Sequence, residues 1–483
     1  MYRPRYHFTA PKGWLNDPNG LIQHNGVYHL FYQHNPYSSV WANMHWGHAT
    51  SHDLIHWQHH PIALAPSDDK SAYDAGGVFS GCCVIADDGT PTIIYTGVAA
   101  PNYTPQVPAL AFGDANLQTW QKYPLNPIIQ PPSHLNIVGF RDHTVWKENG
   151  QWHQLIGSGI RGQGGCVFHY TSANLLEWDY VGIALQSNDL PNAGHNSGTM
   201  WECPDFFSLP HPNQAPNMAL CISPIPLNQV HYVLGEWRNN QLTPHAQGIL
   251  DYGTAMWAPQ SFTAEDGRRI MIGWLRESRP SHEQSADTWN GVMTLPRVLS
   301  LSADGKKIIS QPATEVELLR GEVHQSAPQA IHDQQPVTLP VQSNCCEINL
   351  EIAPGDAGQI MVTVCHSPNK EERTSISYDH VHQSLWLDTT HSRQNSASGQ
   401  ANASPMLLAQ GETLKLRIFI DVSVVEVYAN QGTCLSGRIY PLREDSKNIT
   451  IHCNRGSVFL QKCEIWSMKN TVGESPTNDD VSK

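Results

Sequence analysis

The sequence contains no uninterrupted apolar run of about 18 residues, the length that a membrane-spanning helix requires, so no membrane segment is expected. Its first residues, MYRPRYHFTAPKG, lack the apolar centre of a secretory signal. No Lys- or Arg-rich run occurs, and the formal net charge is −14. Because nucleic acids and anionic membranes attract basic surfaces, neither is expected as a partner.

Signatures of metal binding and of disulfides are also missing. The 11 cysteines include the adjacent pairs Cys82-Cys83 and Cys345-Cys346 but no C-x-x-C spacing. None of the 26 histidines belongs to an H-E-x-x-H motif. Zinc sites and disulfide frameworks need regular ligand spacing, so we expect no metal, no cofactor and free thiols. Free thiols and the absence of a visible signal indicate a cytoplasmic protein, and secretion after removal of a signal is the alternative.

The abundant residues favour strands, turns and a sugar as the bound molecule. The 483-residue chain has 34 Pro, 36 Gly and 15 Trp, which predicts two or three domains of short strands. Aromatic faces pack on sugar rings, while amides and carboxylates bond sugar hydroxyls. A neutral, hydroxyl-rich substrate therefore suits this composition.

Two kinds of turn recur through the first 300 residues. In the first kind, Asp or Asn precedes Leu, and a Trp follows the Leu three positions later. These turns end at Trp57, Trp120 and Trp178. The second kind is an Asx-Gly turn that opens an apolar strand, which is a strong hairpin signal. These turns begin at Asn25, Asp88, Asn149 and Asp266.

A polar motif precedes each Asx-Gly turn by six to eight residues. The motifs hold Asp17 in KGWLNDPNG, Ser80 in VFSGCC, Asp142 in FRDHTVW and Gln260 in WAPQSF. A fifth motif, MWECPDFFSLP, carries Glu202 and Asp205 without the turn. Alone, the residues around Asp17 predict only a turn. Five units of about 60 residues, each with a polar motif at the same strand, instead predict a β-propeller in which Asp17, Asp142 and Glu202 converge.

The repeat ends near residue 312, and the pattern then changes to alternating apolar residues, as in EINLEIAP and RIFIDVSVVEVYANQG. Such alternation is typical of a β-sandwich. The predicted fold is therefore all-β, a five-bladed β-propeller followed by a C-terminal β-sandwich. The expected boundaries are 1–312 for the propeller, 313–329 for a linker, 330–469 for the sandwich and 470–483 for a flexible tail.

Three carboxylates in an aromatic-lined pocket predict glycoside hydrolysis, in which one acid protonates the leaving oxygen and a second carboxylate meets the developing positive charge. Asp17 lies on a rigid turn, which suits a nucleophile. In the sequence, Glu202 is flanked by Trp201, Cys203 and Pro204. An apolar setting would raise the pKa of Glu202 and keep it protonated, as a general acid requires.

The order of the motifs resembles glycoside hydrolase family 32, which includes invertases, sucrose-6-phosphate hydrolases, inulinases and levanases. The motifs are WLNDPNG, FYQHNP, MHWGHA, FSG, FRD, WECPD, APQSF, MTLPR and DVSVVEVYANQG. The resemblance implies a retaining double displacement on β-fructosides. In it, Asp17 resembles the nucleophile, Glu202 the acid/base, and Asp142 the transition-state stabiliser, supported by Arg141. The positions that match the family's fructose pocket are Trp14, Asn16, Gln33, Trp41, Phe79, Ser80, Trp257 and Trp274.

Two departures from the family pattern leave the substrate open between sucrose, sucrose 6-phosphate and fructans. The family usually has Pro after the Arg-Asp pair, whereas this chain has His143. That side chain either points into the blade or bonds Asp142 or a neighbour. Bacterial relatives often have Asp and Tyr near FYAPQ, whereas TAMWAPQ here carries Ala255 and Trp257. One polar group of the pocket is therefore expected to be missing.

The leading function is a β-fructofuranosidase that cleaves sucrose and short β-fructosides. A fructosyltransferase or a fructan exohydrolase would use the same covalent intermediate. A non-catalytic sugar-binding propeller is the alternative from another class, and it predicts loss of Asp17 or Glu202, both of which are present.

Overall fold

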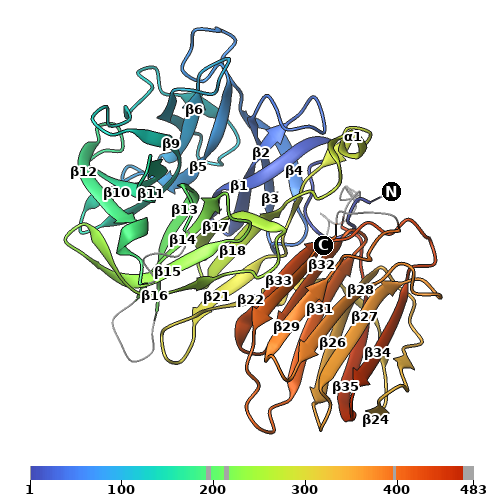
Figure 1. Cartoon of the computed structure of the whole chain (residues 1–483). Coiled ribbons are helices and arrows are strands. Elements are labelled where there is room, and N and C mark those ends of the chain that lie inside the picture. Colours follow the sequence, from blue (N-terminus) through green and yellow to red (C-terminus); the bar gives the residue numbers. More distant parts are fainter. Residues whose placement is uncertain (1, 192–196, 211–216, 395–398, 472–483) are drawn as a thin grey trace.

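A computed structural model describes residues 2–191, 197–210, 217–394 and 399–471. The part of the expected tail from 472 onward lies outside the described residues. The molecule consists of two all-β bodies, a propeller and a sandwich, packed side by side (Figure 1). In the described ranges, no helix is both long and apolar enough to cross a membrane.

Five sheets of four or five strands form the propeller, and their strands pair antiparallel except for the parallel pair of β1 and β19. The first blade contains β1 (Gly13–His24), β2 (Val27–Asn35), β3 (His45–Ser51), β4 (Gln58–Leu64) and the late strand β19 (Trp289–Asn290). The second contains β5 (Gly77–Ile85), β6 (Pro91–Val98), β7 (Gln106–Gly113) and β8 (Trp120–Lys122). The third contains β9 (Ile137–Glu148), β10 (Gln151–Ile160), β11 (Gly164–Ser172) and β12 (Asp179–Gln186). The fourth contains β13 (Met200–Leu209), β14 (Asn217–Ile225), β15 (His231–Arg238) and β16 (Gln241–Ile249).

The fifth blade closes the ring. It contains β17 (Met256–Thr263), β18 (Arg269–Leu275), β20 (Val292–Met293), β21 (Arg297–Leu301) and β22 (Ile308–Pro312). The first strands of the blades, β1, β5, β9, β13 and β17, each contact the first strands of both neighbouring blades. The five innermost strands therefore surround one central axis, as the repeat predicts. Short helices lie outside the sheets: η1 (Ser187–Asp189), α1 (Ser281–Gln284), η2 (Thr314–Leu319) and η3 (Asn430–Gly432).

The Trp-bearing turns have one common geometry. In each turn the Leu has a left-handed φ between 56° and 66°. The indole N–H of the following Trp donates to the carbonyl of that Leu, at 2.8 to 3.2 Å. The three Leu side chains are buried, so their packing offsets the strain of a left-handed non-glycine residue. They are Leu54, Leu117 and Leu175.

Two sheets form the sandwich. The first contains β23 (Arg320–Gln325), β24 (Gln329–His332), β26 (Cys345–Ala353), β31 (Leu414–Asp421), β32 (Val424–Ala429), β33 (Thr433–Arg438) and β35 (Ser457–Met468). The second contains β25 (Val337–Thr338), β27 (Gln359–His366), β28 (Thr374–Asp379), β29 (Ser384–Asp388), β30 (Ala401–Pro405) and β34 (Asn448–Asn454). The segment 313–329, expected to be a linker, is ordered structure, because it contains η2 and β23, and β23 pairs with β35.

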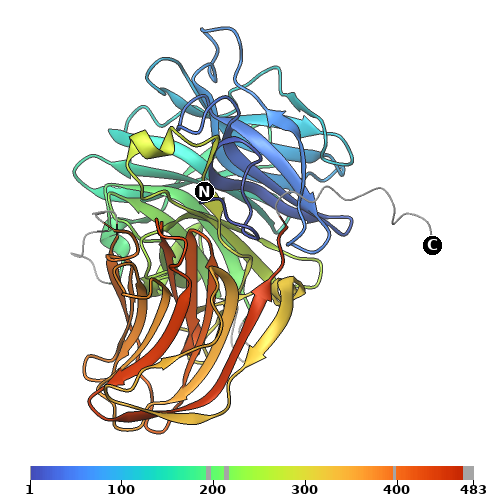
Figure 2. The same cartoon turned by 90° about the vertical axis from the view of Figure 1, so that its right-hand side faces the viewer.

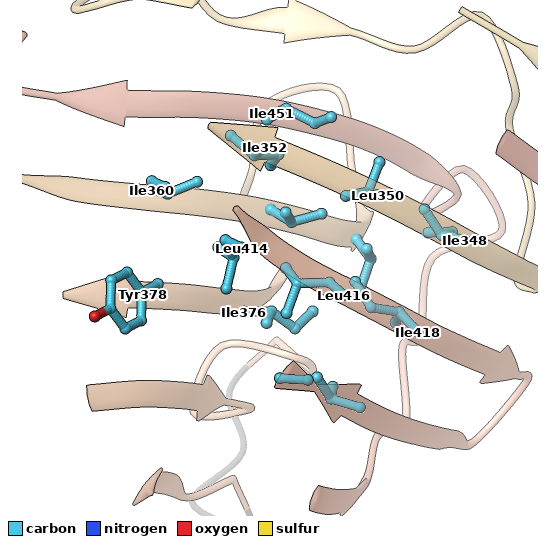
Figure 3. Packing of buried hydrophobic residues seen from close by; sticks show 14 of the residues in the cluster. Ile348, Leu350, Ile352, Ile360, Ile376, Tyr378, Leu414, Leu416, Ile418 and Ile451 are labelled. Atoms are coloured by element: carbon cyan, nitrogen blue, oxygen red, sulfur yellow. The ribbon is translucent and has the colours of Figure 1, made fainter. Parts of the chain in front are cut away.

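Alternating side chains from both sheets fill the sandwich core (Figure 3). Ile348, Leu350 and Ile352 of β26 point the same way because every second residue of a strand shares a face. They meet Ile360 of β27 and Ile376 of β28 from the other sheet (Figure 3). The N-terminal segment runs between the two bodies (Figure 2), and its backbone donates hydrogen bonds to the Asp421 carboxylate of the sandwich.

Candidate active site

Each innermost strand carries a β-bulge at its polar motif. The pairing register shifts between Leu15 and Pro18 in β1, and equivalent shifts occur in the other four blades, at Ser80, at Asp142, between Glu202 and Asp205, and between Trp257 and Gln260. A bulge leaves residues unpaired and turns their side chains away from the normal alternation. The five bulges thereby direct polar side chains from separate blades into one place.

Three bulge residues have left-handed backbone without being glycine. The φ angles are 60° for Asp142, 48° for Cys203 and 47° for Ala258. Such conformations cost about 1–3 kcal/mol each and are concentrated at functional sites. The strain therefore marks the same level of the channel that the sequence motifs indicate.

A cavity of about 400 Å³ opens at this level. It is lined by all the predicted site residues except Trp14, with Tyr103 and Gln106 in addition. The predicted residues that line it are Asn16, Asp17, Gln33, Trp41, Phe79, Ser80, Arg141, Asp142, Glu202, Trp257 and Trp274. Residues as far apart in the sequence as Asn16 and Trp274 are thus brought into a single pocket.

Asp17 is held by hydrogen bonds to both carboxylate oxygens. Asn16 donates to Oδ1 at 2.9 Å, and the Ser80 hydroxyl donates to Oδ2 at 2.6 Å. Burial raises the pKa of Asp17, and the bonds from Ser80 and Asn16 partly oppose that increase. Asp17 is partly exposed to the cavity, so its carboxylate is both fixed and accessible.

Asp142 is 5% exposed and lies beside Cys203. The Cys203 backbone N–H donates to Asp142 Oδ2 at 3.1 Å. The Cys203 thiol lies 3.4 Å from the same oxygen and 3.7 Å from Asp17 Oδ2, so it links the two carboxylates. Burial raises the pKa of Asp142 to about 7, and Arg141 opposes the increase while Glu202 and Asp17 add to it.

Glu202 lies in a polar setting, so the expectation of an apolar one is wrong. Its Oε1 accepts bonds from Arg141 Nη2 at 2.5 Å and Nε at 3.2 Å, and Oε2 accepts the Trp257 indole N–H at 3.2 Å. The side chain of Trp201, its neighbour in sequence, is fully buried in the blade and donates to the Ser197 carbonyl. A bulge turns Glu202 toward the cavity, where 22% of its side chain is exposed.

The remaining predicted residues form a wall and its support. Trp41 and Phe79 pack edge to face at 5.9 Å between ring centres, and Tyr103 packs against both. Trp14 stands behind the wall, where its indole N–H donates to Asn16 Oδ1 at 2.7 Å and its ring contacts Trp274. Trp14 therefore supports Asn16, and it is not among the described residues that line the cavity.

His143 supports the site from behind. Its Nε2 lies 3.2 Å from Thr96 Oγ1, which also bonds the Asp142 backbone N–H and the Ser80 carbonyl. The imidazole thus bonds a neighbour and not the Asp142 carboxylate. Burial lowers the pKa of His143 to about 4, so the ring is neutral near pH 7 and adds no positive charge beside Asp142.

Gln260, the polar residue of the fifth blade, holds the channel together below the cavity. It donates to the Gly81 carbonyl and accepts from the Leu21 N–H, both at 2.9 Å. These bonds join three blades. The recurring polar position is therefore occupied by carboxylates in three blades and by a structural amide in this one.

Sequence reasoning missed Tyr103, Gln106 and the contacts of Cys203. Gln106 begins β7, and its Oε1 accepts bonds from Arg141 Nη1 and from the Phe140 N–H. Tyr103 lies in the loop between β6 and β7. Neither belongs to the repeated motif, so no pattern marked them. For Cys203, the available sequence signal was its position directly after Glu202.

A pocket that combines three carboxylates from separate blades with an aromatic wall defines the class of glycoside hydrolases. The model for the glycosyl hydrolases family 32 N-terminal domain matches residues 7–312. The model for the glycosyl hydrolases family 32 C-terminal domain matches residues 315–467. The chain belongs to glycoside hydrolase family 32, which confirms the resemblance and the predicted fold class.

Named relatives cover nearly the whole chain. It is 34% identical to sucrose-6-phosphate hydrolase from Escherichia coli, over 97% of this chain and 95% of that protein. It is 33% identical to raffinose invertase from Escherichia coli, over 96% of this chain and 95% of that protein. The solved exo-inulinase from Aspergillus awamori superposes with a TM-score of 0.82 at 26% identity, covering 97% of this chain and 99% of that one.

Proposed function

We propose that this protein is a β-fructofuranosidase that releases the terminal fructosyl group of sucrose and of short β-fructosides. The observation that carries the proposal is the convergence of Asp17, Asp142 and Glu202 in one cavity with an aromatic wall. The names of the relatives, a sucrose-6-phosphate hydrolase and a raffinose invertase, point to the same substrate class.

In the first step, Asp17 attacks the anomeric carbon of the fructosyl group. A bond forms between its Oδ atom and that carbon, and the bond to the leaving oxygen breaks. Glu202 gives its proton to the leaving oxygen. Both Arg141 contacts fall on Oε1 of Glu202, whereas Oε2 accepts the Trp257 indole N–H, so Oε2 is the oxygen suited to carry the proton.

In the second step, Glu202 takes a proton from water, and the water oxygen attacks the same carbon. The bond to Asp17 breaks, so the product regains the original anomeric configuration. Asp142, fixed by the Cys203 N–H, accepts hydrogen bonds from fructosyl hydroxyls and stabilises the positive charge of the transition state.

The fixed pocket also favours attack at a chain end. The sugar ring would lie between Trp41 and Phe79 at the rim and Asp142 at the base. A pocket of this shape accepts a terminal residue, so free fructose is the expected product from longer fructans.

We further propose that the protein is located in the cytoplasm. All 11 cysteines are free, including the two adjacent pairs, and Cys203 is the one that is not fully buried. Free thiols are typical of reducing compartments. Titration of 11 reactive thiols in the unfolded protein, purified from its native cell without reductant, would support this location, and fewer would contradict it.

The function is tested by incubation with sucrose, sucrose 6-phosphate, raffinose and inulin, with fructose and glucose release followed over time. Equal early release of fructose and of its partner sugar is expected. Asp17→Asn should abolish release from all four, while Glu202→Gln should spare substrates with activated leaving groups. No fructose from any of the four would refute the proposal, and transfer to sugar exceeding release to water would identify a fructosyltransferase.

A further inference from the structure

One amide oxygen, Oε1 of Gln106, holds both the backbone and a side chain of the strand that carries Asp142. It accepts the Phe140 N–H at 3.0 Å and Arg141 Nη1 at 3.1 Å. Two donors on the same atom fix which end of the amide is the oxygen. Gln106 begins β7 of the second blade, whereas Phe140 and Arg141 belong to β9 of the third. The contact therefore anchors Arg141 to a neighbouring blade.

The guanidinium of Arg141 is shared between three neighbours. Its Nη1 atom bonds Gln106, while Nη2 and Nε bond Oε1 of Glu202 at 2.5 and 3.2 Å. The Nε atom also lies 3.8 Å from Asp142 Oδ2, which is a longer ion pair. A guanidinium is a planar fork of donors, so fixing one nitrogen determines where the opposite edge points. Gln106 thus keeps that edge closer to Glu202 than to Asp142.

A glycine provides the room that the guanidinium needs. A Cβ at Gly139, two residues before Arg141, would lie 2.5 Å from Arg141 Nη1 and 3.0 Å from the flexible end of Met200. A contact as short as 2.5 Å forces one of the two groups to move, and the end of an arginine side chain moves more easily than backbone. Gly139 and Gln106 therefore confine the same nitrogen from two sides.

We propose that Gln106 is a positioning residue for the catalytic acid. It holds Arg141 so that the guanidinium fixes Oε1 of Glu202 and leaves Oε2 directed at the leaving oxygen. The inference rests on the proposed function. Gln106 lines the cavity, but this role acts through Arg141 and requires no contact with the reacting atoms. Proton transfer itself is unchanged, because Glu202 still gives its proton to the leaving oxygen as the bond to the anomeric carbon breaks.

The test compares two substrates that differ in their need for an acid. The glucose oxygen of sucrose is a poor leaving group that requires a proton, whereas the phenolate of 4-nitrophenyl β-fructofuranoside leaves with little help. Gln106→Leu should lower kcat/KM about 10- to 100-fold for sucrose and less than about threefold for the nitrophenyl substrate. The second step does not enter, because kcat/KM covers only the steps up to release of the leaving group. Gln118→Leu changes a half-buried glutamine on the β7–β8 turn of the same blade and is the matched control, with both values unchanged.

The pH profile adds a readout that a purely structural defect would not move. Four strands carry the charged and titratable groups around Glu202, which are Asp17 on β1, Arg141 and Asp142 on β9, Cys203 on β13 and Arg276 on β18. Arg141 is the cation in direct contact, so its displacement favours the protonated form of Glu202. In Gln106→Leu, the basic limb of kcat/KM for sucrose should therefore move to higher pH by about one unit.

A second variant reaches the same contact without changing Gln106. Gly139→Ala places a methyl group against Arg141 Nη1 and should reproduce the selective loss on sucrose. Gly139 is not among the glycines with positive φ, so alanine fits its backbone conformation. The Phe140 N–H keeps its acceptor in this variant, which therefore decides the question if Gln106→Leu fails to fold.

The natural protein is the reference that keeps this inference separate from the hydrolytic function. If it cleaves sucrose but the variants lose equally on both substrates, Arg141 acts through Asp142 or through the fold, and the proposal is overturned. An unchanged kcat/KM for sucrose in either variant, or a basic limb that stays in place, would also overturn it. Failure of the natural protein to release fructose would refute the proposed function itself and, with it, this inference.

Discussion

The hydroxyl of Ser80 controls the charge of the proposed nucleophile. It donates to Asp17 Oδ2 at 2.6 Å and so favours the ionised carboxylate, against the burial that raises the pKa of Asp17. Ser80→Ala should raise that pKa further and move the acidic limb of kcat/KM to higher pH by about one unit, since one pKa unit corresponds to about 1.4 kcal/mol. Ser80→Thr keeps the hydroxyl and serves as control. An acidic limb that stays in place or moves to lower pH would contradict this role.

The charge of Asp142 is expected to cost stability while it serves catalysis. Burial raises its pKa to about 7, above the ordinary value of an unfolded chain. A group of this kind contributes stability below its unfolded pKa and loses it as pH rises through the folded one. Asp142→Asn should therefore raise Tm at pH 8 and leave it nearly unchanged at pH 4.

The same substitution should lower kcat by at least about 100-fold, the scale of a preorganised transition-state contact. Thermal unfolding at both pH values and steady-state kinetics on sucrose measure the two effects. A lower Tm at pH 8 would contradict the raised pKa of Asp142, and a kcat within tenfold of the natural protein would contradict its role in the transition state.

Among the secondary-structure elements, the bulges of the innermost strands position the side chains of the site. Cys203 has a φ of 48°, which a β-branched side chain tolerates poorly. Cys203→Val should therefore destabilise the protein by about 1–3 kcal/mol and lower kcat, because the strand would shift Glu202. Cys203→Gly relieves the strain and should keep the fold.

Cys221→Val is the matched control, because Cys221 is a buried cysteine of the adjacent strand β14 and is not among the residues with positive φ. Unfolding by denaturant and kcat on sucrose provide the comparison. If both valine variants lose the same stability and the same kcat, backbone strain at Cys203 does not determine the position of Glu202.

The elements that carry the site were predictable because each blade repeats them. The turns at Trp57 and Asn25 mark strand ends, and in four blades a polar motif precedes the Asx-Gly turn by six to eight residues. The bulges themselves were not predictable, since Asp142 and Cys203 occupy left-handed positions where the sequence shows no glycine. Gln106 was equally hidden, because its contact with Arg141 is created only when two blades pack together.

In the whole molecule, a network of buried charged side chains joins the propeller to the sandwich. Arg297 of β21 bonds Asp251 at 2.9 Å and Glu426 of β32 at 2.6 Å, and all three side chains are fully buried. His7 of the N-terminal segment bonds Glu426 from the other side at 3.1 Å. Sequence patterns do not reveal such a network, because its members lie far apart along the chain.

Loss of Glu426 should leave Arg297 as a buried, partly unmatched charge. Burial alone would raise the pKa of Glu426, but Arg297 and His7 outweigh it and lower it to about 2. The stabilisation is therefore present above the ordinary carboxyl pKa and lost as pH falls toward 2. Glu426→Ala should reduce the free energy of unfolding at pH 7 by about 3–5 kcal/mol.

Denaturant unfolding, followed by Trp fluorescence, measures that loss. Glu371→Ala removes an exposed partner of Arg443 and should cost at most about 1 kcal/mol. Equal small losses in the two variants would show that the network between the two bodies adds little stability.

In the proposed mechanism, Asp17 attacks from one blade while Glu202 protonates from another. Transfer to methanol tests it most directly, because methyl fructofuranosides keep their anomeric configuration in solution. With sucrose as donor, methyl β-fructofuranoside is the expected product by NMR, formed by the natural protein and not by Asp17→Asn. Methyl α-fructofuranoside as the product, or β-product formed equally well without the Asp17 carboxylate, would contradict this mechanism.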